Sequence, residues 1–284
     1  MYPETKDPLN LTMSDCNVDF AKAVSPPEDQ IDVAYAALLS ARDAYPDLDI
    51  QLYLERLDDM AGQMLPRLAD AHPIDVFRTY LFEELGFRGN TDDYFDPRNS
   101  FLNQVIDRRI GIPISLSVIY LELARRMDLP FVGIALPGHF IIRYDGDAEP
   151  VYLDPYNAGV TMTIEDCRQR INDISGGRLP FKSEFLDPVG PRQILARLLR
   201  NLKAIYVARA EFDAAVRMAE KLMLLIPSAI DEIRDLGVLH YYAGNKLKAI
   251  DFLEKYLNLA PEADDLDTVQ HNLGVIIKKV ARWN

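Results

Sequence analysis

The C-terminal third of the chain repeats itself with a fixed period, and this repeat limits the fold more than any other feature of the sequence. Pro227 and Pro261 are 34 residues apart, and the segments that precede them align without gaps. Such a period is typical of a repeated pair of helices, and one pair alone cannot bury its apolar face. The aligned pairs are Leu202 with Leu236, Ala210 with Gly244 and Ala215 with Ala249. The tail is therefore expected to stack helix pairs against each other.

The period and the places of its small residues and prolines resemble those of the tetratricopeptide repeat, in which each unit is two antiparallel helices. The tryptophan that begins the repeat consensus is missing, and Leu199 and Ile233 occupy its two positions. Two units and a last helix over about residues 266–280 predict a short solenoid within residues 191–284. Two helix pairs that match the period by coincidence are the alternative.

The composition indicates a folded globular protein with room for two domains. Of the 284 residues, 49% are hydrophobic and 26% are charged. The charge is uneven: residues 191–284 hold 14 basic and 12 acidic side chains, whereas residues 1–190 hold 17 basic and 32 acidic ones. A strongly acidic body repels phosphate backbones, so we expect no nucleic-acid partner. Solubility alone is the plainer explanation of the acidity.

The sequence shows no signal for export or for a membrane. Met1 to Asn17 lacks a basic start followed by an apolar run, and no apolar run approaches the ~18 residues of a membrane span. Cys16 and Cys167 are far apart and outside any CxxC motif, which argues against a disulfide scaffold and a zinc site. We expect a cytoplasmic protein without membrane contact, metal or cofactor, and the sequence leaves the oligomeric state open.

The first 190 residues change from helical to strand periodicity along the chain. Residues 1–24 are polar and unpatterned, and they predict a flexible arm. Ser25, Pro26 and Glu28 have the pattern of a capping box that opens a helix. The predicted fold class is α+β, with a mostly helical start and a mixed core in one domain over residues 25–190. Further helices are expected over about residues 49–65, 74–86, 101–109 and 113–127, and strands over residues 130–136, 139–144 and 149–156.

One helix in this region begins with proline. The stretch "GIPISLSVIYLELARRMDLP" (residues 111–130) has the apolar spacing of a buried helix and places Pro113 at its first position. Proline suits that position, because the backbone N–H that it lacks would have no helical partner there. Two strand-like segments follow, "LPGHFIIRY" with His139 and "YLDPYNAG" with Asp154.

This order of helix start, histidine and aspartate resembles the core of the transglutaminase-like superfamily, a papain-like mixed fold. Its members place a cysteine nucleophile at the start of a helix and a histidine and an aspartate on adjacent strands. The histidine and the helix N-terminus favour the thiolate, and the aspartate holds the imidazole tautomer.

A closer resemblance is to the SirB-type transglutaminase-like family, which carries tetratricopeptide repeats behind that core. It rests on "EELGFRGNTDDYFDPRNSFLNQVIDRRIGIPISLSVIYLELARRMDLP" together with the two segments quoted above. The likeness covers about residues 28–170 continuously, and also the tail. Because long runs match as well as spaced residues, the resemblance is specific.

The superfamily triad carries over onto this chain with one member missing. His139 matches the histidine and Asp154 matches the aspartate, but Pro113 occupies the cysteine position. Proline offers no nucleophile and no proton. The resemblance therefore implies a remnant triad in a chain that is not an enzyme.

Other assignments of these residues stay open at this stage. Ser115 and Ser117 are weak candidates for a substitute nucleophile, and Cys167 is expected to be a half-buried small residue. His139 and Asp154 form either a satisfied structural pair or part of a binding pocket that reuses the old cleft. Four polar residues beside the cleft are candidates for binding, and their alternative roles are helix capping and surface ion pairing. They are Asn99, Asn103, Asp107 and Arg108.

These observations favour a pseudoenzyme: a non-catalytic transglutaminase-like domain joined to repeats, acting as a cytoplasmic interaction or regulatory protein. The expected partner is a protein or peptide. One alternative is a hydrolase or amide-transfer enzyme that uses His139 and Asp154 with an unconventional nucleophile or an activated water. Another is a protein that binds small molecules or peptides in the remnant cleft.

In the predicted hairpin Tyr144 pairs with Glu149, which sets His139 opposite Asp154 and within hydrogen-bond reach.

Overall fold

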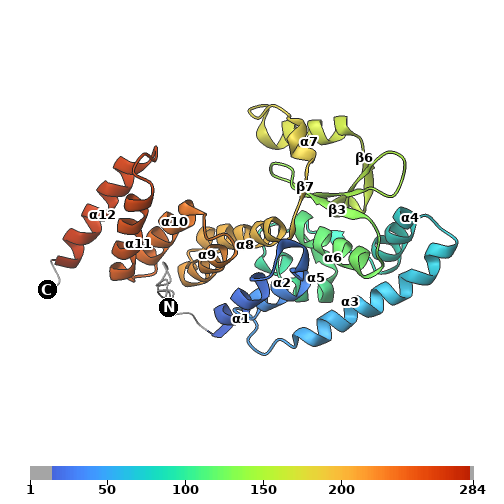
Figure 1. Ribbon diagram of the computed structural model, residues 1–284, viewed down its shortest axis with the longest axis horizontal. Helices are drawn as coiled ribbons and strands as arrows, with labels where there is room; N and C mark the ends of the chain where they lie inside the picture. The colour runs from blue at the N-terminus through green and yellow to red at the C-terminus, as the bar shows by residue number, and fades with distance from the viewer. Residues whose placement is uncertain (1–14, 282–284) are drawn as a thin grey trace, which may run out of the picture.

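The computed structural model describes residues 15–281 of the chain. Figure 1 shows a mixed helix-and-sheet body at one end and a row of helices that extends away from it. The fold is α+β, with a transglutaminase-like body and a helical repeat region, as the sequence predicts. None of the described helices is long and apolar enough to cross a membrane.

Helices form the start of the body. They are α1 (Asp15–Val24), α2 (Val33–Ala41), α3 (Ile50–Met64) and α4 (Pro73–Phe77), and α4 continues into a π-helical segment, Arg78–Glu84. Aspartate side chains begin two of them: Asp32 accepts from the backbone N–H of Tyr35, and Asp49 accepts from that of Leu52. Such caps satisfy N–H groups that have no partner inside the helix.

Helix α1 corrects the prediction of a flexible arm over residues 1–24. Phe20 and Val24, four residues apart, are buried, and α1 packs against helix α9 (Phe212–Leu225) of the tail. Helix α1 also packs on α2, and its contact with α9 joins segments about 200 residues apart, which a local pattern does not reveal. Residues 1–14 of the predicted arm lie outside the described residues.

The predicted capping box at Ser25 is also wrong. The Ser25 hydroxyl donates to the carbonyl of Lys22 at the end of α1, and α2 begins later, at Val33, with Asp32 as its N-cap. Glu28 instead binds Arg192, accepting from its backbone N–H at 2.9 Å and pairing with its guanidinium at 3.1 Å. A carboxylate that joins two distant segments has no local sequence pattern.

The sheet lies between α6 (Pro113–Arg126) and α7 (Ile164–Ser175). Its strands, all antiparallel, follow the order β6-β5-β4-β3-β7. One face packs on α6, and the other forms a separate core with Cys167 and Ile171 of α7. The strands are β3 (Phe131–Ile134), β4 (Ile141–Tyr144), β5 (Val151–Asp154), β6 (Val160–Met162) and β7 (Pro188–Val189). A separate parallel pair, β1 (Arg88–Gly89) and β2 (Ile110–Gly111), flanks α5 (Leu102–Arg108).

The register of the β4–β5 hairpin differs from the predicted one by two residues. Tyr144 pairs with Val151 rather than with Glu149, because the loop between the strands is longer than the predicted four residues. A shift of two residues leaves every side chain on its predicted face of the sheet. His139 and Asp154 are therefore not directly opposite each other as predicted, but their side chains keep the same face of the sheet.

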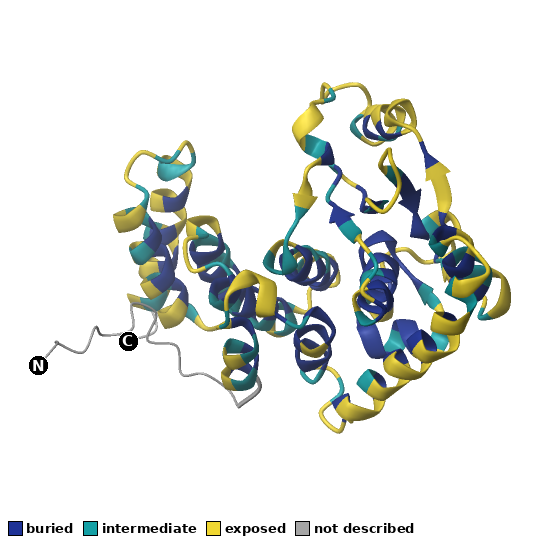
Figure 2. Ribbon diagram, turned by 45° about the vertical axis from the view of Figure 1, so that its right-hand side comes forward, coloured by how far each residue is buried: buried dark blue, intermediate teal, exposed yellow. Residues whose placement is uncertain are grey.

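The tail consists of antiparallel helices, with Pro227 and Pro261 directly after the second helix of each pair. The tail helices are α8 (Pro191–Ala208), α9, α10 (Ile230–Tyr242), α11 (Lys246–Leu259) and α12 (Leu266–Ala281). Ala215 and Ala249 are fully buried, and a Cβ on Gly237 would come within 2.6 Å of Leu253. Small residues are needed where helix axes approach this closely. Figure 2 shows the buried residues on the inward faces of these helices.

The tail is docked on the body. Helix α8 packs against α2 and α6, and the Arg192 guanidinium donates to the carbonyls of Val24 and Pro26. The fully buried Lys221 ammonium lies 2.5 Å from the Asp43 carboxylate and donates to Asn17. Since α8 contacts both parts, the division into two domains at residue 190 stays a prediction.

Candidate functional site

Helix α6 begins in the interior of the body with a residue that has no reactive atom. Ile112 is extended, Pro113 is the first helical residue, and both are buried. The fixed φ of proline suits this position. The structure thus places a saturated ring at the helix start, where the superfamily resemblance implies a thiol.

The hydroxyl closest in sequence to Pro113 is already engaged. Ser115 Oγ accepts from the backbone N–H of Ile112 at 3.0 Å and donates to the carbonyl of Asn99 at 2.6 Å. It is buried and ties the helix start to the preceding loop. Ser117 Oγ is buried too, with no hydrogen-bond partner among the described residues. Ser115 therefore has the contacts of a capping residue.

His139 and Asp154 lie together, as the sequence predicts. Nε2 of His139 is 2.8 Å from Oδ2 of Asp154. His139 follows a tight turn at Gly138, where φ is +76° and a Cβ would come within 2.4 Å of Ile174. Asp154 ends β5 and caps the short turn that follows it, accepting from the backbone N–H of Tyr156. Both side chains are therefore fixed by local backbone structure.

The carboxylate of Asp154 is fully buried and fully satisfied. Besides His139 and Tyr156, it accepts from Asn157 Nδ2 at 2.7 Å, and Arg170 lies 3.6 Å away. Burial alone would raise the pKa of Asp154, but the bond and charge of His139, the Asn157 bond and the Arg170 charge together lower it below its ordinary value. An ionised carboxylate holds the Nε2–H tautomer of the histidine and leaves Nδ1 as an acceptor.

The surroundings of the pair are closed and aromatic. His139 is 5% exposed, and the Tyr156 ring stands edge-on to it at 6.2 Å. The Tyr156 hydroxyl donates to the carbonyl of Asn90, and a Cβ on Gly89 would come within 2.6 Å of the ring. These contacts connect the pair to the loop of residues 90–100.

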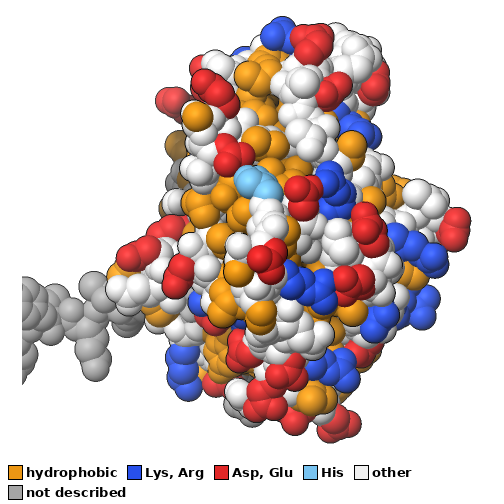
Figure 3. Space-filling model, turned by 90° about the vertical axis from the view of Figure 1, so that its right-hand side faces the viewer, with side chains coloured by type: hydrophobic (Ala, Val, Ile, Leu, Met, Phe, Trp, Pro, Cys, Tyr) orange, Lys and Arg blue, Asp and Glu red, His pale blue; other side chains and the backbone are white. Residues whose placement is uncertain are grey.

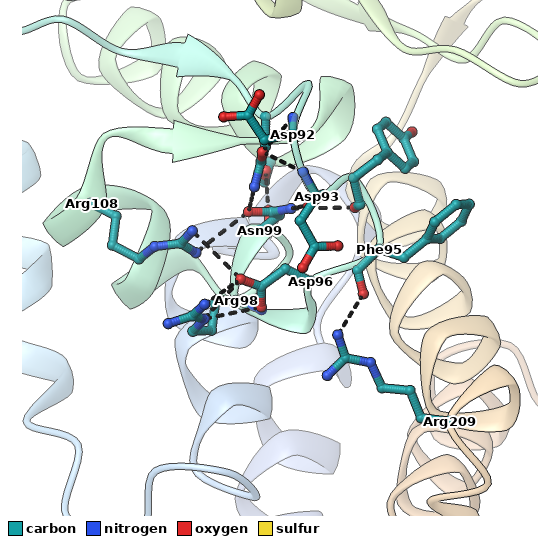
Figure 4. A network of polar contacts seen from close by, with 11 residues as sticks. Asp92, Asp93, Phe95, Asp96, Arg98, Asn99, Arg108 and Arg209 are labelled. Carbon is teal, nitrogen blue, oxygen red and sulfur yellow. Dashed lines mark hydrogen bonds and ion pairs between the residues drawn. The ribbon is translucent and has the colours of Figure 1, made fainter.

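Two of the four predicted binding residues meet in that loop. Asn99 is fully buried, and its amide donates to the carbonyls of Asp93 and Tyr94 while its oxygen accepts from Asn90. Arg108 approaches the Asn99 oxygen at 3.4 Å and the Asp96 carboxylate at 3.6 Å. Figure 4 shows that these side chains hold the loop together. Their contacts are those of loop-stabilising residues.

The other two predicted binding residues lie elsewhere. Asp107 points to α3, where it accepts from the Tyr53 hydroxyl at 2.6 Å and pairs with Arg56 at 2.5 Å. It lines a hollow of about 440 Å³ between α3 and the end of α5, away from the residues of the pair. Asn103 is buried, with its side-chain oxygen unpaired among the described residues. The structure therefore does not gather the four residues into one site.

The sequence and the fold are those of a known family. A model of the transglutaminase-like superfamily matches residues 51–200, and a tetratricopeptide repeat model matches residues 202–274. A UPF0162 protein of Xylella fastidiosa is 38% identical over 244 residues, which cover 84% of this chain and 87% of that protein. The chain belongs to the UPF0162 family. The SirB-type resemblance is thereby confirmed.

Other relatives extend the comparison. A UPF0162 protein of Pseudomonas aeruginosa is 30% identical over 251 residues, covering 87% of this chain and 92% of that protein. Human F-box only protein 21 is 26% identical over 210 residues, which cover 70% of this chain but only 32% of that protein. A region like this chain thus occurs within a longer protein of a different name.

Three contributors to the site were missed by the sequence argument: Tyr156, Asn157 and Arg170. The motif "LDPYNAG" places Asn157 three residues after Asp154, which is capping distance, so its bond to Asp154 could have been found. Arg170 comes from α7, and only the fold brings it to the pair.

Cys167 is fully buried, and burial raises the pKa of its thiol to about 11, so it is an unreactive core residue. Within residues 15–281 no cluster of three metal-ligating side chains occurs.

Proposed function

We propose that this protein is a non-catalytic, transglutaminase-like member of its family that acts as a cytoplasmic interaction or regulatory module and binds a protein or peptide partner. The observation that supports the proposal is the start of α6, where Pro113 is buried at the position that the superfamily resemblance assigns to the nucleophile. Covalent catalysis needs an attacking group, a base beside it and donors for the oxyanion. Here the first of these is missing.

The retained pair then has a structural role. His139 precedes β4, Asp154 ends β5, and Asn157 and Arg170 converge on the same carboxylate. Removing one partner of such a buried pair leaves an uncompensated polar group. Its retention in a chain without the cysteine is therefore explained by folding alone.

The engagement of Ser115 argues against the enzyme alternative. Its hydroxyl proton is directed to the carbonyl of Asn99 and its lone pair accepts from Ile112 N–H, so an attack would first break both bonds. The repeat match over residues 202–274 supports the partner-binding half of the proposal, because stacked helix pairs present extended binding surfaces. Figure 3 shows acidic and basic side chains mixed over one face of the body, without the continuous basic patch that nucleic acid prefers.

The test measures turnover of ester and amide substrates by the full chain, together with labelling by iodoacetamide located by mass spectrometry. We expect no turnover and no label at residues 113–117 in the wild type. Turnover that disappears in His139→Ala would overturn the proposal.

A pair of substitutions tests whether Pro113 stands at the nucleophile position. Pro113→Cys alone and Pro113→Cys combined with His139→Gln place the same thiol in the same buried position at the start of α6. If that thiol lies beside His139, its labelling should begin at a lower pH in the single variant than in the double variant. Equal labelling profiles of the two variants would contradict the assignment of Pro113.

A further inference from the structure

The loop of residues 90–100 holds two aromatic side chains at the surface on a rigid frame. Phe95 is 68% exposed and Tyr94 is 38% exposed, with their rings edge-on at 5.4 Å. The loop beneath them is fixed: Asp96 and Asn99 are buried, and Asn99 bonds the carbonyls of Asp93 and Tyr94. A rigid loop that exposes large apolar side chains without covering them is typical of a binding surface.

Helix α8 supplies positive charge beside these rings. The Arg209 guanidinium donates to the carbonyl of Phe95 at 3.2 Å, and Figure 4 shows it reaching up from the helix to the loop. Arg197 is half-buried and close enough to Tyr94 and Arg200 for their charges to act on it, and burial lowers its pKa below the ordinary arginine value. Among the described residues no carboxylate pairs with Arg197. A partly desolvated guanidinium without an anion can donate its N–H groups to a carboxylate of a partner.

We infer that this surface, made of Tyr94, Phe95, Arg197, Arg200 and Arg209 and here called the Phe95 surface, binds an acidic segment of a partner protein. A carboxylate of the segment pairs with Arg197, and a neighbouring apolar side chain packs on Phe95. The inference rests on the proposed function, because it names the place and the chemistry of the partner binding.

Two of the three acids of the loop act on arginines outside this surface. The Asp96 carboxylate pairs with Arg98 and Arg108, and the charge of Asp93 acts on Arg98, whereas the Asp92 carboxylate has no ion-pair partner among the described residues. Arg200 shares Glu232 with Lys203, at the longer distance of 3.5 Å against 2.5 Å. Among the described residues Arg197 has no carboxylate partner, and Arg209 binds a neutral carbonyl. An acidic occupant complements these two guanidinium groups.

The surface also borders the histidine–aspartate pair. The Tyr94 ring lies 6.2 Å from that of Tyr156, which lies 6.2 Å from that of His139. The remnant catalytic centre and the Phe95 surface thus share one aromatic wall. A partner that packs on Tyr94 would therefore be separated from His139 only by the Tyr156 ring.

The experiment selects binders from a random twelve-residue peptide library displayed on phage, with the full chain as bait. Enriched peptides should contain Asp or Glu beside an aromatic or aliphatic residue. Their affinity, measured by fluorescence polarisation, should fall at least tenfold in Phe95→Ala and in Arg197→Gln, and should weaken with added salt.

Matched controls are Leu247→Ala and Arg178→Gln, which remove an exposed apolar and an exposed basic side chain far from the surface in sequence. They should bind like the wild type, and circular dichroism should show that all four variants are folded. Failure to enrich any peptide, or enriched peptides without acidic residues, would overturn the inference. So would affinity unchanged by Phe95→Ala and Arg197→Gln.

A second surface separates this inference from the proposed function. Peptides that lose affinity in Tyr242→Ala, at the hollow of about 130 Å³ between α10 and α12, but not in Phe95→Ala would place the binding site on the repeats. That result would overturn the Phe95 surface and leave the proposed partner-binding function standing.

Discussion

The chain buries one histidine in its sheet-containing body and another in its repeats, and the two are held in opposite ways. His139 is bonded to Asp154, whose carboxylate takes three further polar contacts. His240 of α10 stacks on the Phe252 ring at 5.4 Å, and neither of its ring nitrogens has a hydrogen-bond partner among the described residues. One site is organised by polar contacts and the other by packing.

The difference shows where the sequence has kept a chemical arrangement. A buried polar group without a partner costs free energy. In the repeats, the packing of His240 on Phe252 has to offset this cost. The body surrounds His139 with an orienting network, and the helix start that the superfamily resemblance assigns to a nucleophile holds Pro113. The stabilising effect of this network on the fold can be measured.

The largest effect is expected from Asp154→Ala, which removes the central acceptor of the polar network in the body. The substitution leaves His139, the Tyr156 N–H and Asn157 without their common acceptor in a buried place. Breaking such a pair costs about 3–5 kcal/mol. Chemical denaturation of the full chain, followed by circular dichroism, measures the loss.

Asp154→Asn is the control for this prediction. It keeps the shape and one acceptor oxygen, so the loss in unfolding free energy should be clearly smaller. If alanine and asparagine destabilise the chain equally, the charge-assisted bonds are not what stabilises this region.

A smaller effect is expected from overpacking the repeats. Ala249 is fully buried on α11, where Gly237 of α10 and Leu253 show how closely the two helices approach. Ala249→Leu should therefore cost about 1–3 kcal/mol, measured by denaturation. Leu247→Ala, at an exposed position of the same helix, is the control and should change little. A neutral Ala249→Leu would contradict the packing-based account of the repeats.

Most of the fold was predictable because its signals are local. The 34-residue period, the proline at the start of α6 and the alternating strands each lie within a short stretch of sequence. The errors came where distant segments meet. Helix α1 is stabilised by α9, and Glu28 by Arg192, and neither contact leaves a local pattern.

The candidate site divides in the same way. His139 and Asp154 were found because the alternation of side chains along a strand fixes the face of the sheet on which each lies, and a two-residue shift leaves that face unchanged. Asp107 and Arg108 are neighbours in the sequence, but they bind partners in different segments. Asp107 pairs with Arg56 of α3, and Arg108 pairs with Asp96 of the loop. Which face of a short helix meets which neighbour is set by packing, and the sequence of that helix does not contain it.

A change of pH is expected to affect the buried histidine of the repeats through its lowered pKa. Burial, aided by the charge of Lys248, lowers the pKa of His240 to about 4. As the pH falls from 6.5 to 4, the unfolded chain therefore binds a proton that the folded chain excludes, and stability declines. His240→Phe removes this titration and keeps an aromatic ring against Phe252.

We expect the loss of unfolding free energy between pH 6.5 and pH 4 to be about 2–3 kcal/mol smaller in His240→Phe than in the wild type. Above pH 6.5 the titration of His240 makes no contribution, so the two proteins should respond to pH in parallel there. Denaturation at a series of pH values gives both curves. Curves that stay parallel down to pH 4 would mean that His240 is protonated in the folded chain.

The smallest effect is expected from two buried serines of α6, one with hydrogen-bond partners and one without. Ser115 and Ser117 are both buried in α6, two residues apart, but only Ser115 is satisfied. Ser115→Ala leaves the Ile112 N–H and the Asn99 carbonyl unpaired and should cost about 1 kcal/mol. Ser117→Ala removes a hydroxyl that has no partner among residues 15–281, so it should be neutral or slightly stabilising. Denaturation of the two variants side by side cancels effects of helix propensity, because both replace serine by alanine in the same helix. If Ser117→Ala proves the more costly, the Ser117 hydroxyl has a partner in solution. The conclusion that no serine near the start of α6 can replace the nucleophile would then have to be reconsidered.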